Sequence, residues 1–171
     1  MGPARPLVLG LGNELAGDDA VGVLVARAAR EELGGLADVV ESAASGMALI
    51  EILAGYERAI VVDAIVTGRK PPGSIVEMGL DEVGRVVAPS LHHAGLAELA
   101  TVAERLGLRF PTRTRVLAVE VLDPYTFGAP LSEPVARAVG TLVLRVLDQV
   151  ERWRREDGGR SQEARCTTPM R

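Results

Sequence analysis

The sequence predicts an α/β fold: a three-layer α/β/α sandwich around a mostly parallel, twisted sheet of about five strands. Short apolar runs of strand character alternate along the chain with segments whose apolar residues recur at helical spacing. Hydrophobic residues make up 47% of the 171 residues, but aromatic residues only 3%. The core must therefore consist mostly of Val, Leu, Ile and Ala, as expected for a buried parallel sheet that helices cover.

The first expected strand and helix meet in a glycine turn. Residues 6–12 form a continuous apolar run closed by glycines, the pattern of a buried strand. A helix then opens at Asp18 or Asp19, carries its apolar side chains on one face, and ends at the glycine pair 34–35.

The middle of the chain supplies three more strands. Residues 37–42 are expected to form the second strand and residues 46–54 a helix. Residues 58–66 give the strongest strand pattern, nearly all β-branched or apolar, with Asp63 as the one interruption. A turn then leads to a shorter strand over residues 74–80.

The remaining residues complete and cover the sheet. We expect a helix over 94–106, a strand over 115–122, and a long helix over 133–155 with apolar residues at helical spacing. Residues 1–156 are thus expected to form one α/β domain, and the polar, glycine-containing residues 157–171 a disordered tail.

Charge and composition argue against several classes of function. The net charge is −4 and no block of like charges occurs, so a nucleic-acid-binding surface is not expected. No apolar window of about 18 residues is free of charges, and signal-peptide cleavage would destroy the glycine turn, so neither a membrane span nor secretion is expected. The single cysteine, Cys166, lies in the tail, which excludes an internal disulfide and a thiolate metal cluster. We expect a cytoplasmic monomer.

Acidic residues and histidines follow the carboxyl ends of the predicted strands, where ligands bind in such sheets. Asp19, with Asp18 beside it, follows the first strand, and Asp63 lies at the end of the third. The only histidines, His92 and His93, follow the fourth. Two carboxylates and an imidazole at the carboxyl edge of one sheet predict a site for zinc, nickel or another divalent ion.

Each of these residues also has a structural explanation. Asp18 and Asp19 suit a helix N-terminus, although one aspartate would suffice there. Histidines in a loop are commonly just solvated, and Gly10 and Gly12 suit a tight turn without any ligand. Asp63 is the exception, because burying a carboxylate among apolar side chains costs a few kcal/mol or more unless it is paired, hydrogen-bonded or metal-bound.

Three sequence blocks carry a family resemblance: GLGNELAGDDAVG at 10–22, VVDAIVTG at 61–68 and SLHHAGLAEL at 90–99. Two further segments support it, SGMALIEIL at 45–53 and LAVEVLDPYTFGAPLSEPV at 117–135. Together and in this order they resemble the hydrogenase maturation endopeptidases, which trim the large subunit of NiFe hydrogenases. The resemblance covers the chain from about residue 7 to residue 150.

The resemblance implies an endopeptidase that removes a C-terminal extension from the nickel-loaded precursor of the hydrogenase large subunit. Matched by position, Asp19 rather than Asp18, Asp63, and His92 rather than His93 would be both the catalytic residues and the metal ligands. The nickel would be carried by the precursor, and another divalent ion would be a candidate occupant in the isolated protein. The carboxylates beside the glycine turn would then recognise a cation.

Three other functions are weighed against this one. A nickel-dependent checkpoint or chaperone that docks on the precursor without cutting needs the same ligands. Peptidyl-tRNA hydrolases also begin with GLGN, but a proline and a glycine follow there, whereas this chain continues with Glu14 and Leu15. A nucleotide-binding module is disfavoured because paired aspartates at the turn would repel phosphate.

Overall fold

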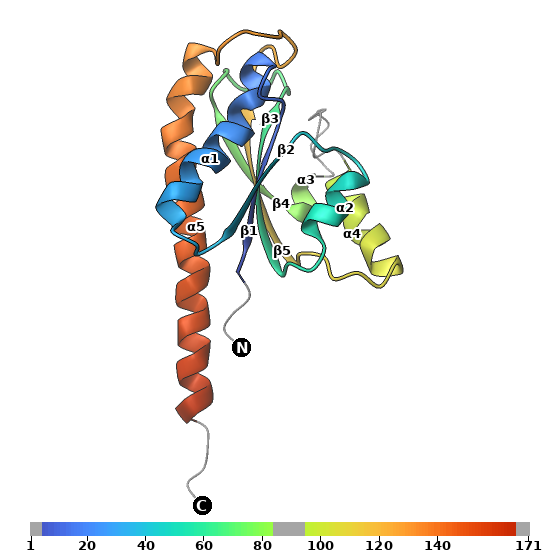
Figure 1. Cartoon of the computed structure of the whole chain (residues 1–171), viewed down its shortest axis with the longest axis vertical. Helices are drawn as coiled ribbons and strands as arrows, with labels where there is room; N and C mark the ends of the chain where they lie inside the picture. Colours follow the sequence, from blue (N-terminus) through green and yellow to red (C-terminus); the bar gives the residue numbers. More distant parts are fainter. Residues whose placement is uncertain (1–4, 84–94, 167–171) are drawn as a thin grey trace, which may run out of the picture.

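The computed structural model of the chain describes residues 5–83 and 95–166. Its centre is a five-stranded sheet with the strand order β2-β1-β3-β5-β4 (Figure 1). The strands are β1 (Leu7–Leu11), β2 (Asp38–Ser42), β3 (Arg58–Ile65), β4 (Ile75–Gly79) and β5 (Arg113–Glu120). Neighbouring strands pair in parallel except at the edge, where β4 runs antiparallel to β5. The predicted α/β fold around a mostly parallel sheet is confirmed.

Helices cover both faces of this sheet. The helical elements are η1 (Gly17–Ala20), α1 (Val21–Leu33), α2 (Ala48–Leu53), α3 (Leu80–Val83), α4 (Leu96–Arg105) and α5 (Glu133–Cys166). Helices α1 and α5 lie on one face, and α2, α3 and α4 lie on the other (Figure 1). Successive strand residues point to opposite faces, so Val62 joins the apolar cluster under α1 and α5, and Val61 joins the cluster under α2 and α4. None of the helices in the described part of the chain combines the length and apolar character that crossing a membrane requires.

Glycines let α1 approach the sheet closely. A Cβ atom on Gly22, in the first turn of α1, would lie 2.2 Å from the carbonyl oxygen of Leu11 and 2.3 Å from that of Val62. A Cβ atom on Gly10 of β1 would lie 2.2 Å from the carbonyl oxygen of Gly22. Glycine is therefore required where the backbones meet, and the N-terminal end of α1 is fixed over the ends of β1 and β3.

The last helix is longer than its sequence pattern predicts. Helix α5 continues past residue 155 to Cys166, so residues 157–166, expected in a disordered tail, are helical. The glycine pair 158–159 suggested a break, but a glycine inside a helix costs only about 1 kcal/mol. A long-range contact fixes α5 at Asp157, two residues past its predicted end.

Arg58 provides this anchor. Its side chain is buried, and one guanidinium nitrogen donates to both carboxylate oxygens of Asp157 at 2.6 and 2.8 Å. The other terminal nitrogen donates to the carbonyl of Trp153 at 3.3 Å. The Trp153 ring packs against two guanidinium groups, with the carbon of Arg58 at 5.9 Å and that of Arg113 at 5.8 Å from its centroid.

Replacing Asp157 with alanine is expected to lower the free energy of unfolding by about 3 kcal/mol, because the charge of Arg58 would stay buried without its partner. Urea denaturation measures the loss. The matched control is Asp148→Ala, which removes the carboxylate that accepts from Arg152 at 2.7 Å on the exposed side of the same helix. That change should be far milder. Similar, small effects of both substitutions would contradict the anchor.

Candidate functional site

Asp19 and Asp63 lie at the same edge of the sheet, where β1 and β3 end at the top of Figure 1. Asp63 is fully buried within β3, in register with Ala118 of β5. Asp19 is 2% exposed and lies in η1, which contacts β3. Because Gly22 sits directly on the carbonyl of Val62, the start of α1 is held beside the residue that precedes Asp63. The structure therefore places these two predicted site residues at the same edge of the sheet, in elements that contact each other.

The carboxylate of Asp19 is held by the glycine turn. The backbone N–H of Asn13 donates to its Oδ2 at 2.6 Å. Gly12 has a φ of 142°, and a Cβ atom there would lie 1.9 Å from the carbonyl oxygen of Asp19. A phosphate-binding turn would offer such an N–H to its ligand. Here the protein's own carboxylate takes it, which argues against the nucleotide-binding alternative.

Asp18 has a different role from its neighbour. Its Oδ1 accepts the backbone N–H of Ser132 at 2.7 Å, and its Oδ2 accepts the Ser132 hydroxyl at 2.9 Å. Ser132 ends the loop between β5 and α5, so Asp18 holds that loop against the turn after β1. The two adjacent aspartates thus make different contacts: Asp18 holds the loop before α5, whereas Asp19 accepts a hydrogen bond from the turn after β1.

Asp63 lies on the sheet face that α2 and α4 cover, by the same alternation that places Val61 there. Its Oδ1 accepts the N–H of Ala64 at 2.8 Å. His92 and His93, predicted to complete the site, lie outside the described residues. Within residues 5–83 and 95–166, no three His, Cys, Asp or Glu side chains are grouped so that they would hold a metal ion. A metal at this edge needs further ligands besides the two aspartates.

Sequence reasoning did not single out a third buried carboxylate at this edge. Glu120 ends β5 at 2% exposure and accepts the backbone N–H groups of Thr67 and Gly68, both at 2.7 Å, together with the Thr67 hydroxyl. It fixes the loop that follows β3. Its signal in the sequence, one acid in an apolar strand, is the same as that of Asp63, so burial of a carboxylate by itself does not identify a reactive group.

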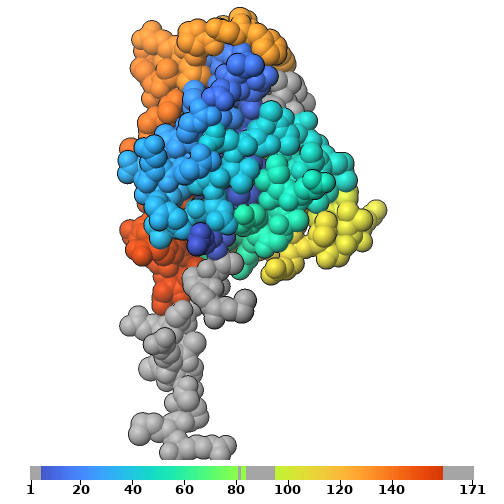
Figure 2. Space-filling model, in the orientation of Figure 1, coloured from blue at the N-terminus to red at the C-terminus, as the bar shows by residue number. Residues whose placement is uncertain are grey.

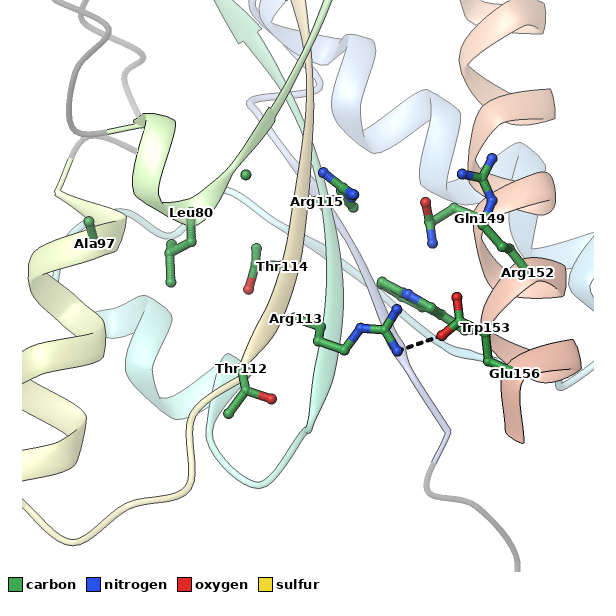
Figure 3. Close-up of a pocket in the computed structure, with 11 residues that line it drawn as sticks. Leu80, Ala97, Thr112, Arg113, Thr114, Arg115, Gln149, Arg152, Trp153 and Glu156 are labelled. Carbon is green, nitrogen blue, oxygen red and sulfur yellow. Dashed lines mark hydrogen bonds and ion pairs between the residues drawn. The ribbon is translucent and has the colours of Figure 1, made fainter. Parts of the chain in front are cut away.

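Two open hollows lie near the opposite edge, where β3 and β5 begin. One, of about 640 Å³, is bordered by Leu80 and Thr114 and, on the α5 side, by Arg113 and Trp153 (Figure 3). Arg113 donates to Glu156 at 2.7 Å across it. The other, of about 760 Å³, lies between α4 and the start of β3. Neither hollow includes Asp19 or Asp63.

Comparison with known proteins identifies the family. A family model described as hydrogenase maturation protease matches residues 23–149. The chain belongs to the hydrogenase maturation protease family. The match begins after the turn that carries Asp19, so the placement of that residue rests on the sequence block 10–22 and on the contacts described above.

Curated relatives and solved structures agree with this assignment. The hydrogenase expression/formation protein HupD of Bradyrhizobium diazoefficiens is 33% identical over 136 residues, which cover 77% of this chain and 70% of that protein. The hydrogenase 2 maturation protease of Escherichia coli is 29% identical over 149 residues, covering 84% and 90%. The structure of the hydrogenase maturating endopeptidase HybD from E. coli superposes with a TM-score of 0.74 at 26% identity, covering 87% of this chain and 93% of HybD.

Membership in this family makes the chain a hydrolase of the peptidase class. It also removes the peptidyl-tRNA hydrolase alternative, whose resemblance was confined to the opening GLGN. The two buried aspartates at the carboxyl edge therefore lie in a peptidase.

Proposed function

We propose that the protein is an endopeptidase that removes a C-terminal extension from the nickel-loaded precursor of a NiFe hydrogenase large subunit. Asp19, Asp63 and His92 contact the nickel that the precursor carries. The observation that carries this proposal is the burial of two carboxylates, Asp19 at 2% and Asp63 at 0% exposure, at the strand ends where the family resemblance expects metal contacts. Family membership supports the reaction class.

The donor set suits a divalent cation brought by the substrate. Two carboxylates and one imidazole are oxygen and nitrogen ligands of the kind that nickel accepts. Because they are only part of a coordination shell, positions remain for the groups that hold nickel in the precursor. In the isolated protein the same residues would offer a weaker site to another divalent ion.

Nickel held in this way fixes the neighbouring peptide bond against the site. Positioning of this kind lowers a reaction barrier by about 7 kcal/mol or more. The chain offers no recognised nucleophile motif, so we assign the attack to water: its hydroxyl adds to the carbonyl carbon, the C–N bond breaks, and the proton passes to the leaving amine. We further propose that the enzyme acts as a cytoplasmic monomer.

The two adjacent histidines provide a matched pair of variants. His92→Ala is expected to reduce cleavage about 100-fold or more, because it removes a proposed ligand. His93→Ala is expected to leave the rate within a few-fold of wild type. Single-turnover cleavage of the same precursor measures both. The reverse order of effects would assign the ligand position to His93.

The proposed reaction is tested by incubating the purified protein with the nickel-loaded precursor of its host's hydrogenase. Intact-mass spectrometry should show the precursor replaced by a shorter protein plus a C-terminal peptide. A pull-down from the same mixture measures binding. Binding with no loss of mass would contradict an endopeptidase and favour the docking checkpoint.

A further inference from the structure

Two loops beside the candidate site expose large apolar side chains. Leu15, in the turn after β1, is 67% exposed, and in the loop after β5 Leu122, Tyr125 and Phe127 are 78%, 60% and 70% exposed. We call these four residues the rim. The two loops lie side by side at the top of the molecule, the first in blue and the second in orange (Figure 2). The N–H of Gly128 donates to the carbonyl of Leu15 at 2.8 Å, which joins them directly.

The rim is built on a fixed backbone. Asp123 accepts the N–H groups of Tyr125 at 2.8 Å and Thr126 at 3.2 Å, and the Thr126 hydroxyl as well. The hydrogen bonds from the Thr126 hydroxyl and the Tyr125 N–H hold the pKa of Asp123 below its ordinary value. The contact of Asp18 with Ser132 closes the far end of the loop. A surface already ordered in this way loses little conformational entropy when a partner binds.

Aromatic residues are scarce in this chain, yet two of them are exposed in the rim. Only five aromatic residues occur in the sequence, one Trp, two Tyr and two Phe. The Trp is buried at 2% exposure, whereas Tyr125 and Phe127 project from one short loop. Exposed aromatic side chains on an ordered loop are typical of the centre of a protein–protein interface. Apolar side chains that are grouped on a surface, unlike those scattered singly, mark interaction sites.

We propose that the rim is the docking surface for the folded body of the hydrogenase precursor, which presents an apolar patch beside its scissile extension. The inference rests on the proposed function and extends it to the recognition of the substrate. Continuity with the site supports this occupant. Leu15 lies two residues after Asn13, whose N–H holds Asp19, and Asp18 ties the rim loop to the same turn. A substrate that reaches Asp19 therefore lies against the rim.

The test compares the double variant Tyr125→Ser/Phe127→Ser with Leu144→Ser, which removes a side chain that is 67% exposed on α5, outside the rim. Calorimetric titration with the nickel-loaded precursor gives Kd, and intact-mass kinetics give KM and kcat. We expect the double variant to raise Kd and KM at least tenfold, with the loss carried mainly by KM. Leu144→Ser should change neither more than twofold, and the melting temperatures should agree.

Binding and cleavage are measured separately, so that the proposed endopeptidase reaction and the proposed docking surface can be contradicted independently. A wild-type protein that binds the precursor through the rim without cutting it would contradict the proposed reaction and leave the docking surface supported. An unchanged Kd and KM in the double variant would overturn the docking surface. So would a wild-type dimer, detected by light scattering, that dissociates in the double variant, because the rim would then belong to a second copy of the chain.

Discussion

Asp63→Asn is expected to reduce cleavage of the nickel-loaded precursor by about 10³-fold or more while the protein stays folded. Asparagine keeps the shape of the side chain and an oxygen that can accept the N–H of Ala64, now made to Oδ1 at 2.8 Å. It removes the negative charge that the proposed nickel contact requires. Single-turnover kinetics by intact mass measure the effect, and circular dichroism confirms the fold. Asp19→Asn should behave in the same way.

Glu120→Gln is the matched control for this prediction. Glu120 is a carboxylate at the same edge of the sheet, 2% exposed at the end of the adjacent strand β5. It accepts hydrogen bonds from the backbone N–H groups of Thr67 and Gly68 and from the Thr67 hydroxyl, and glutamine can still accept from the backbone. Cleavage should therefore remain within about tenfold of wild type. An Asp63→Asn protein that cleaves normally, or equal losses in both variants, would contradict a specific role for Asp63.

Gly22→Ala is expected to lower the free energy of unfolding by about 3 kcal/mol. Alanine is normally favoured over glycine within a helix by about 1 kcal/mol. Here its Cβ atom would lie 2.2 Å from the carbonyl oxygen of Leu11 and 2.3 Å from that of Val62, which are backbone atoms of two strands. The start of α1 would have to move away from the sheet and would carry Asp19 away from Asp63. Loss of cleavage should therefore accompany the loss of stability in urea denaturation.

Gly140→Ala gives the opposite expectation in the same protein. Gly140 lies within α5, and a Cβ atom on it would meet no atom within 4 Å. Helix propensity alone then applies, and the substitution should stabilise the protein by about 0.5–1 kcal/mol without affecting cleavage. Stabilisation by both substitutions would show that the close approach at Gly22 is not needed.

Most elements could be predicted from the sequence because hydrophobic periodicity is local. The run at 58–66 became β3, and the glycine pair at 34–35 ends α1, with Gly34 in the left-handed region at a φ of 52°. Hydrophobic periodicity could not predict that β4 runs antiparallel to β5, because periodicity carries no information on strand direction. Its short connection from β3, residues 66–74, nevertheless excludes a parallel crossover, which needs about a dozen residues or more.

Contacts between distant segments explain what the sequence could not predict. Residue Asp157, placed in the tail by the sequence pattern, is held to the fold by Arg58, 99 residues away. The roles of Asp18 and Asp19 differ because Asp18 meets Ser132, 114 residues away. The choice of Asp19 over Asp18 as the metal contact came from the family resemblance. Residue type and position in the predicted fold did not distinguish the two aspartates. The assignment of His92 stays a prediction, since it lies outside the described residues.

The most direct test of the central claim is a comparison of nickel-loaded and nickel-free precursor as substrates. Both are incubated with the wild-type protein and with Asp63→Asn, and their intact masses are followed over time. We expect loss of the C-terminal peptide only where nickel and the Asp63 carboxylate are both present. Equal cleavage of the nickel-free precursor would contradict recognition of a substrate-borne cation by these carboxylates.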